Sequence, residues 1–235
     1  MSALGRLART PLAAPLRALA NHAVGSQPRV VKIRGGLARG LRAELDLRNE
    51  KAFWLGHYEP HVQAFLRANV RPGDVVYDVG ANVGFFSLCA AQLGGRVYAF
   101  EVAAGNVARL ERNVGASGLP IEVVEAAVWE EDGTVDFVSG ENASEGHVLP
   151  GFGVRAIALD SFARDNEPPT VLKIDVEGAE LHVLRGAQEV LATSVRALTC
   201  ELHAGVDRDA VLALLAAFAV DVSDDGTRIM ALRGA

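Results

Sequence analysis

The 235-residue sequence has little of several things that mark special classes of protein. It holds two cysteines, Cys89 and Cys200, and both fall inside segments expected to form regular structure. A disulfide scaffold does not fit this pattern, whereas two small buried side chains in a reducing compartment do. No stretch approaches the ~20 apolar residues of a membrane-spanning helix. We therefore expect a soluble, cytoplasmic protein.

Acidic residues are absent from the first 43 positions, although the whole chain carries a formal net charge of −6. An acidic surface does not attract a phosphate backbone, so the overall charge argues against a nucleic-acid partner. Residues 6–20 are loosely amphipathic, but prolines interrupt them and they lack the long apolar centre of a secretory signal. We expect a solvated lead-in helix or a contact with an anionic membrane or substrate. The basic residues of this region are Arg6, Arg9, Arg17, Arg29, Lys32, Arg34, Arg39 and Arg42.

From residue 70 onward, short β-rich runs alternate with helical stretches. Turn signals bound the strand candidates, which are 75–79, 96–101, 121–128, 134–138, 154–159, 170–175, 197–202, 220–225 and 227–232. Apolar residues at helical spacing predict helices over 84–93, 105–116, 178–192 and 207–219. Two hairpins are expected, one between 124–129 and 134–138 and one at the end of the chain.

This alternation predicts an α/β fold with a parallel sheet covered by helices on both faces. The final hairpin adds an antiparallel strand to that sheet. We divide the chain into a basic lead-in or cap segment, 1–69, and a ligand-binding domain, 70–235. Segment 139–153 is expected to be a loop, either a plain connection or, through Ser144 and His147, a substrate contact.

A glycine loop follows the first strand of the domain, where the chain reads Asp-Val-Gly-Ala-Asn-Val-Gly from Asp78. Gly80 permits a tight turn, and Gly84 lets a ligand approach the start of the helix. Glu101, at the end of the next strand, can accept hydrogen bonds from both ribose hydroxyls of a nucleoside. Asn82 stands where a dinucleotide-binding loop has its second glycine. Asp78 would repel a pyrophosphate and suits a cationic amino group, such as that of S-adenosylmethionine.

A second polar group follows two later strands. Lys173 and Asp175 share a side of their strand, Glu177 follows in the turn, and Glu201 and His203 share a face after the next strand. With an ordinary pKa near 6.5, a histidine can accept a proton near neutral pH. We expect Asp175 or His203 to remove a substrate proton, Glu177 and Glu201 to orient the reacting groups, and Lys173 to steady Asp175. An ion-pair network that merely closes the sheet is the alternative.

Asp175, Glu201 and His203, with Glu177, would also suit a divalent cation such as Mg²⁺, Mn²⁺ or Zn²⁺. Their spacing matches no specific metal motif, so a bound cation is the less favoured interpretation of the cluster.

The motifs together resemble the FkbM family of S-adenosylmethionine-dependent methyltransferases over residues 50–203. The resemblance rests on the sequences at 77–88, 99–101, 106–114, 125–137 and 159–162, and above all on VLKIDVEGAELHVLRGAQEVL at 171–191 and CELH at 200–203. After Glu101 the family often reads EPxPxN. This chain has Val102 and Ala104 at the proline positions and keeps Asn106.

The resemblance implies a Rossmann-like class I methyltransferase fold, with a mainly parallel seven-stranded sheet that has one antiparallel strand. It implies methyl transfer from S-adenosylmethionine, usually to a hydroxyl of a macrolide, sugar or glycolipid, with S-adenosylhomocysteine as product. The cofactor-binding residues that it implies are Asp78, Gly80, Asn82, Gly84, Glu101, Asn106 and Tyr58. Tyr58 lies in a leading segment, FWLGHYE, that either closes over the cofactor with Trp54 and Glu59 or simply packs on the domain through Phe53 and Trp54.

Two other interpretations compete with a methyltransferase. A nucleotide-binding oxidoreductase on a Rossmann fold is disfavoured by Asp78 and by the missing middle glycine. A non-catalytic relative that binds a cofactor or a partner protein is disfavoured because the acids and His203 are all present. Oxygen, nitrogen and carboxylate acceptors stay open, as does the oligomeric state.

Overall fold

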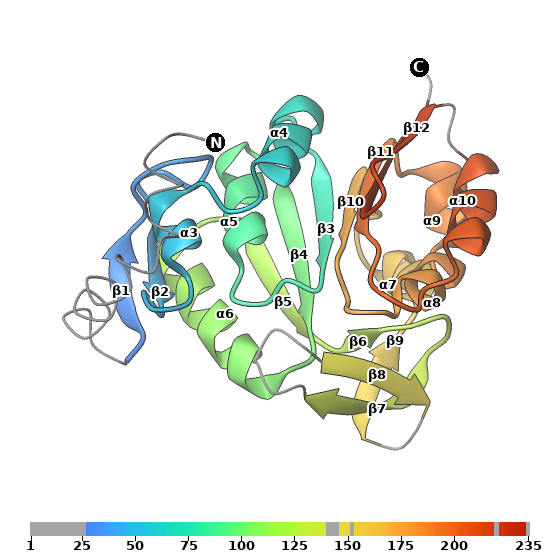
Figure 1. Cartoon of the computed structure of the whole chain (residues 1–235), viewed down its shortest axis with the longest axis horizontal. Coiled ribbons are helices and arrows are strands. Elements are labelled where there is room, and N and C mark those ends of the chain that lie inside the picture. Colours follow the sequence, from blue (N-terminus) through green and yellow to red (C-terminus); the bar gives the residue numbers. More distant parts are fainter. Residues whose placement is uncertain (1–26, 140–145, 151–152, 219–220, 234–235) are drawn as a thin grey trace, which may run out of the picture.

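The computed structural model describes residues 27–139, 146–150, 153–218 and 221–233. Its centre is a seven-stranded sheet with the order β12-β13-β11-β10-β3-β4-β5 (Figure 1). Strand β13 runs antiparallel to both neighbours, and the other pairings in this sheet are parallel. The predicted α/β sheet and its closing hairpin are therefore confirmed. The strands are β3 (Val75–Val79), β4 (Arg96–Glu101), β5 (Ile121–Glu125), β10 (Val171–Ile174), β11 (Ala197–Glu201), β12 (Asp221–Asp224) and β13 (Arg228–Leu232).

Helices cover both faces of this sheet, because the side chains of its central strands are apolar in both directions. In β3, Val76 faces one apolar core and Tyr77 the other. The first core includes residues of α4 (Pro60–Asn69), α5 (Phe85–Gln92) and α6 (Ala104–Ser117). The second includes residues of α7 (Leu159–Asp165), α8 (Glu180–Arg185), α9 (Gln188–Thr193) and α10 (Arg208–Ala216). Cys89 and Cys200 are buried and unpaired, as expected.

The single helix predicted over 178–192 is wrong, since α8 and α9 are separate. Asp160 explains the break. Its carboxylate accepts hydrogen bonds from the backbone N–H groups of Glu189 and Val190, both at 2.9 Å, and so caps the start of α9. At the break, a Cβ on Gly186 would lie 2.2 Å from the carbonyl oxygen of Trp129. The glycine therefore lets the chain turn against the neighbouring strand segment.

The strand pairing of a small second sheet was also predicted incorrectly. It has the order β6-β9-β7-β8, with β6 (Ala127–Val128), β7 (Gly133–Ser139), β8 (Gly146–Pro150) and β9 (Val154–Ile157). The expected hairpin between 124–129 and 134–138 does not form, because β9 lies between β6 and β7. Residues 146–150, expected in a loop, form strand β8. Ser144 and the side chain of His147 lie outside the described part of the chain.

The leading segment packs on α6. Its elements are the antiparallel pair β1 (Arg29–Lys32) and β2 (Arg42–Leu45), followed by α3 (Lys51–Leu55). Arg109 of α6 donates to Glu50 at 2.6 Å, and Arg112 forms an ion pair with Glu44. The amphipathic segment 6–20 lies outside the described residues. No helix in the described ranges is long and apolar enough to cross a membrane.

Candidate active site

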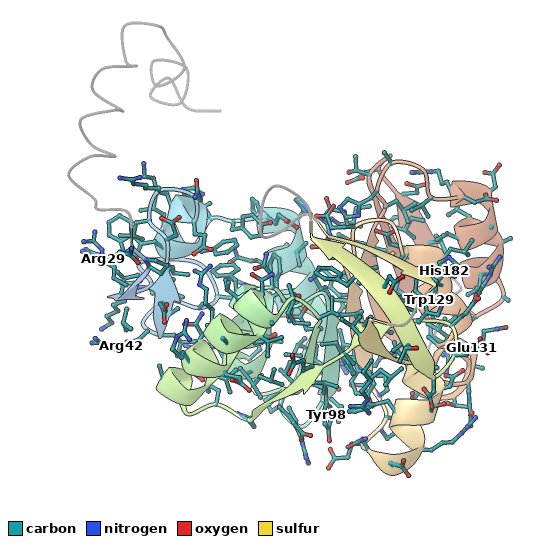
Figure 2. All side chains as sticks on the ribbon, turned by 90° about the horizontal axis from the view of Figure 1, so that it is seen from below. Arg29, Arg42, Tyr98, Trp129, Glu131 and His182 are labelled. Atoms are coloured by element: carbon teal, nitrogen blue, oxygen red, sulfur yellow. The ribbon has the colours of Figure 1, made fainter. Side chains whose placement is uncertain are left out.

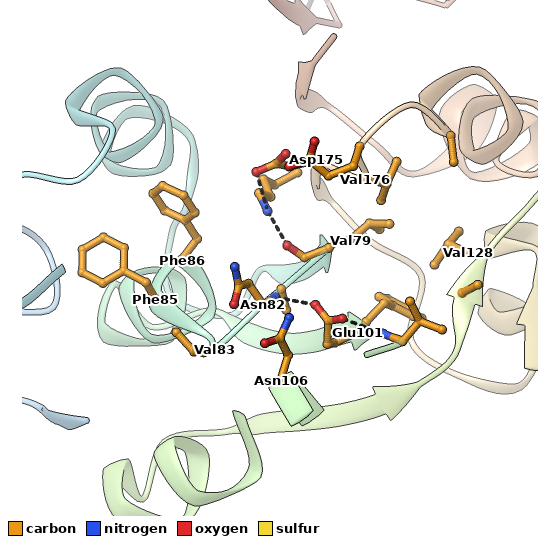
Figure 3. A pocket seen from close by; sticks show the side chains of 18 of the residues that line it. Val79, Asn82, Val83, Phe85, Phe86, Glu101, Asn106, Val128, Asp175 and Val176 are labelled. Atoms are coloured by element: carbon orange, nitrogen blue, oxygen red, sulfur yellow. Dashed lines mark hydrogen bonds and ion pairs between the residues drawn. The ribbon is translucent and has the colours of Figure 1, made fainter. Parts of the chain in front are cut away.

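A cavity opens at the carboxyl ends of β3, β4 and β10 (Figure 3), where parallel sheets of this kind bind their ligands. The glycine loop, the end of β4, the segment after β10 and the leading segment all contribute to it. Of the predicted cofactor residues, Gly80, Asn82, Glu101, Asn106 and Tyr58 line the cavity. Of the predicted catalytic residues, Lys173, Asp175 and Glu177 do so.

Glu101 is held by three backbone N–H groups. One carboxylate oxygen accepts from Asn82 at 2.8 Å, and the other accepts from Val102 at 2.9 Å and Ala103 at 2.8 Å (Figure 3). Asn82 adopts φ +52°, in the left-handed region, within the turn that leads from β3 to α5. These bonds tie the glycine loop to the next strand and fix an acid at the cavity wall, at the position predicted for ribose recognition.

The two glycines of the loop serve packing more than ligand approach. A Cβ on Gly80 would lie 1.8 Å from the carbonyl oxygen of Asp175. A Cβ on Gly84 would lie 2.5 Å from the side chain of Leu110, and Gly84 is not among the cavity-lining residues. The expected close approach of a ligand to Gly84 is therefore corrected to a close approach of α6. Gly80 is the residue that allows Asp175 its position.

Asp78 does not line the cavity and is 1% exposed. Its carboxylate accepts from the Ser87 hydroxyl at 2.5 Å and pairs with the Lys173 ammonium at 3.1 Å. The expectation that Asp78 meets a cationic cofactor group directly is therefore corrected, because Lys173 already neutralises it. Burial lowers the pKa of Lys173, but the charges of Asp78 and Asp175 outweigh burial and raise it, so the ammonium stays protonated.

Lys173 connects this buried pair to the cavity. Its Nζ donates to the carbonyl oxygen of Gly80 at 2.9 Å and lies 3.6 Å from a carboxylate oxygen of Asp175. The predicted contact with Asp175 is present, but the contact with Asp78 is shorter. Lys173 thus orients both carboxylates and the turn of the glycine loop.

His203 lies among carboxylates on both sides of its ring. Nδ1 is 2.6 Å from an oxygen of Glu180, whose residue is completely buried. Nε2 is 3.2 Å from Glu177 and 3.8 Å from Asp175. The hydrogen bond to Glu180 is the main cause that raises the pKa of His203 to about 9; burial opposes the rise, and the charges of Glu177 and Asp175 add to it. The expected pKa near 6.5 is thus corrected, and the ring is an imidazolium at neutral pH.

Glu201 belongs to a separate ion-pair group. Arg228 of β13, whose side chain is 3% exposed, donates to Glu201 and, at 2.8 Å, to Glu59. Burial raises the pKa of Glu201, and the charge of Asp175 adds to this rise. Glu201 and His203 emerge at the predicted end of the sheet, but neither lines the cavity.

The leading segment contributes aromatic side chains to the cavity. Phe53 and Tyr58 line it, and their ring centroids are 4.3 Å apart in an edge-on contact. Trp54 does not line it, because its ring packs under the guanidinium of Arg34 at 5.4 Å. Of the three residues expected to close over the cofactor, Tyr58 alone is among the described cavity-lining residues, whereas Trp54 packs against Arg34 and Glu59 pairs with Arg228.

Two groups of side chains have the spacing of metal ligands. Asp175, Glu177 and His203 form one, and Glu59, Asp175 and Glu201 form the other, with ligand atoms within 4.8 Å of one another. The predicted set of Asp175, Glu201 and His203 is thereby divided between them. In the second group Arg228 already supplies positive charge to two of the acids.

The sequence interpretation missed two residues that organise the site, Glu180 and Arg228. Each has a signal in the sequence. Arg228 is a lone charge in the strand run TRIMAL, and a buried charge requires a partner. Glu180 lies three residues after Glu177, at the start of a helix that faces the next strand.

Comparison with family models and curated proteins points to the FkbM methyltransferases. A model described as the Methyltransferase FkbM domain matches residues 78–223. Hexuronic acid methyltransferase AglP of Haloferax volcanii is 31% identical over 67% of this chain and 67% of its own length. The 31-O-demethyl-FK506 methyltransferase FkbM of Streptomyces tacrolimicus is 29% identical over 60% of this chain and 70% of its own. The crystal structure of a methyltransferase FkbM from Methylobacillus flagellatus superposes with a TM-score of 0.49 at 14% identity, covering 93% of this chain and 58% of that one.

Proposed function

The chain belongs to the FkbM family of S-adenosylmethionine-dependent methyltransferases, and we propose that it methylates a hydroxyl group of a sugar or small natural product. The named relatives act on a hexuronic acid and on 31-O-demethyl-FK506. The observation that carries the cofactor part of the proposal is Glu101, a carboxylate at the cavity wall that three backbone amides fix, whereas the acceptor part is supported by the named relatives.

The cavity suits the adenosyl part of the cofactor. Three backbone N–H groups occupy one lone-pair site on one oxygen of Glu101 and both on the other, so the fixed carboxylate keeps one site at the cavity for a hydrogen bond from a ribose hydroxyl. Asn82 and Asn106 line the cavity as well, and Val102 and Val128 offer apolar surface for an adenine ring. These residues would hold S-adenosylmethionine, which when bound supplies a methyl group on a positively charged sulfur.

Proton removal from the acceptor is assigned to Asp175. Its side chain lines the cavity and is 20% exposed, so an acceptor hydroxyl can reach a carboxylate oxygen. His203 is the weaker candidate for a base, because both ring nitrogens face carboxylates and the pKa of about 9 keeps it protonated. We assign His203 and Lys173 to orienting Asp175, and Glu177, which also lines the cavity, to orienting the acceptor.

The cofactor assignment is tested by calorimetric titration with S-adenosylmethionine, S-adenosylhomocysteine and NADH. We expect micromolar binding of the two adenosyl compounds and its loss in Glu101→Ala. Glu125→Ala is the matched control, because Glu125 lies opposite Glu101 in the β4–β5 ladder but is exposed. Binding of NADH alone would replace the methyltransferase with the oxidoreductase interpretation.

The acceptor assignment is tested with radiolabelled cofactor and a panel of sugars and polyols. Asp175→Asn is expected to bind S-adenosylmethionine and to lose turnover by roughly 10²-fold or more. Mild alkali then separates the products, because it cleaves a methyl ester and leaves a methyl ether intact. A label released by alkali would show carboxylate methylation and contradict the hydroxyl assignment.

A further inference from the structure

A second groove, with a volume of about 700 Å³, lies between the β1–β2 pair and α3. Its apolar lining comes from Val31, Ile33, Leu47 and Trp54, of which Ile33 and Leu47 are buried. Its basic lining comes from Arg29, Lys32, Arg34, Arg39 and Lys51, and the first four of these are exposed. No acidic residue is among the described residues that line it. The groove therefore combines an apolar base with a cationic rim.

This groove is distinct from the cofactor cavity. Helix α3 separates the two, since Phe53 lines the cavity and the next residue, Trp54, lines the groove. Figure 2 shows Arg29 at the outer edge of the β1–β2 pair, away from the C-terminal strands. A ligand of the groove thus does not compete with the cofactor.

Basic and acidic residues are unevenly divided between the segment that forms the groove and the rest of the chain. Residues 27–51 hold seven basic and three acidic side chains, whereas residues 52–235 hold thirteen basic and 26 acidic ones. An anionic surface attracts the first part and repels the second, so it orients the molecule with the groove toward that surface.

Exposed apolar side chains accompany the cations. Val30 is 50% exposed and Leu55 is 44% exposed, and they are the large apolar residues identified as exposed within the described part of the chain. Val30 belongs to β1 and Leu55 ends α3, the two elements that border the groove, and both side chains lie beside the groove and not in its lining. Cations mixed with exposed apolar side chains are typical of surfaces that bind at the membrane interface. A nucleic-acid backbone would use the cations alone.

We propose that this groove binds the phosphate of an anionic phospholipid and docks the protein on a membrane surface. The cations of the rim pair with the phosphates of the headgroup layer, and the exposed apolar side chains of β1 and α3 enter the interface beside them. The docking needs no membrane-spanning helix, and it is independent of methyl transfer.

Vesicle flotation of the full chain tests the proposal. We expect binding to phosphatidylcholine vesicles that contain phosphatidylglycerol, little binding to pure phosphatidylcholine, and weakening with salt. In Arg29→Gln/Lys32→Gln/Arg39→Gln the affinity should fall by roughly 100-fold, because each surface cation contributes about 1 kcal/mol. The control Arg67→Gln/Arg71→Gln/Arg155→Gln removes the same charge from exposed positions elsewhere and should retain binding.

Several outcomes would overturn the proposal. Equal loss in both triple variants would mean that only net charge matters. Unchanged binding in the first variant would place the membrane contact outside the groove. Tighter binding of a single-stranded oligonucleotide than of the vesicles would assign the groove to nucleic acid, and displacement from vesicles by millimolar inorganic phosphate would assign it to a free anion. Calorimetry with S-adenosylmethionine on the same samples reports separately on the proposed activity.

Discussion

Gly80→Ala offers the sharpest test of how the fold positions the proposed base. Gly80 has φ +76°, and a Cβ there would lie 1.8 Å from the carbonyl oxygen of Asp175 and 3.4 Å from Val176. The oxygen belongs to the backbone and has no rotamer to change. The strand ends must therefore separate by roughly 1 Å or more to restore van der Waals contact.

The magnitude follows from two separable costs. An alanine in the left-handed region costs about 1–2 kcal/mol, and overpacking of a rigid site adds about 1–3 kcal/mol. Gly118 is the matched control, because it has φ +65° and no described atom lies within 4 Å of its Cβ position. Gly118→Ala should lose only the first cost, and Gly80→Ala should lose about 2–5 kcal/mol of unfolding free energy in total.

Chemical denaturation measures this difference, and turnover measures its effect on Asp175. A displacement of 1 Å at a reacting group costs on the order of 10²-fold in rate. Turnover should fall accordingly in Gly80→Ala and stay near the parent value in Gly118→Ala. Equal stability of the two variants, or full activity of Gly80→Ala, would refute the argument that the glycine exists to admit Asp175.

Three further perturbations test the charges of the site. The pKa of His203, raised to about 9, contributes stability that is complete below pH 6.5 and is lost as the pH rises through 9; relative to His203→Gln, the parent should lose about 3 kcal/mol of unfolding free energy between pH 6 and pH 10. Glu101→Gln puts an amide among three N–H donors and should weaken S-adenosylmethionine binding by at least about tenfold in calorimetry. Arg228→Met leaves two acids without their buried cation and should lower the unfolding free energy by about 3–5 kcal/mol in urea.

Each of these has a control in the chain. Glu180→Gln removes the main cause of the raised pKa and should flatten the same pH dependence as His203→Gln, so a slope that survives in both would contradict the assignment. Glu125→Gln should leave cofactor binding intact. Arg208→Met breaks the more exposed pair with Asp224 and should cost less than about 1 kcal/mol; a similar cost at Arg228 would mean that its burial contributes nothing.

Much of the fold could be predicted because its signals are local. The buried runs at β3 and β10 are bounded by turn residues, and the helices after them have apolar residues at helical spacing. The errors arose where a residue far away in the sequence determines a helix boundary or a strand pairing. Asp160 caps the start of α9 from a distant position in the sequence, and β9 inserts between β6 and β7 from about 20 residues away. Periodicity carries no information about either contact.

The sequence predicted which residues gather at the candidate site better than it predicted which of them contact each other. The sequence places Asp175, Glu177 and His203 at one end of the sheet, since parallel strands bring their carboxyl ends together. It does not say which ring nitrogen meets which carboxylate, and that contact decides the charge of His203. The buried partner of His203, Glu180, lies on a helix. Whether its carboxylate contacts the His203 ring depends on where α8 starts.

Two of the ion pairs that the sequence interpretation missed have one cause, the register of neighbouring strands. Lys173 and Asp78 are direct partners in the β10–β3 ladder, and Glu201 and Arg228 are direct partners in the β11–β13 ladder. In each case the strand holding one charge is apolar around it, and a buried charge in such a strand requires an opposite charge nearby. Once the strand order is known, each lone charge therefore predicts its partner on the adjacent strand. On this reasoning the direct contact of Asp78 with a cofactor, expected from the loop alone, gives way to a buried pair, because the strand order places Lys173 beside it.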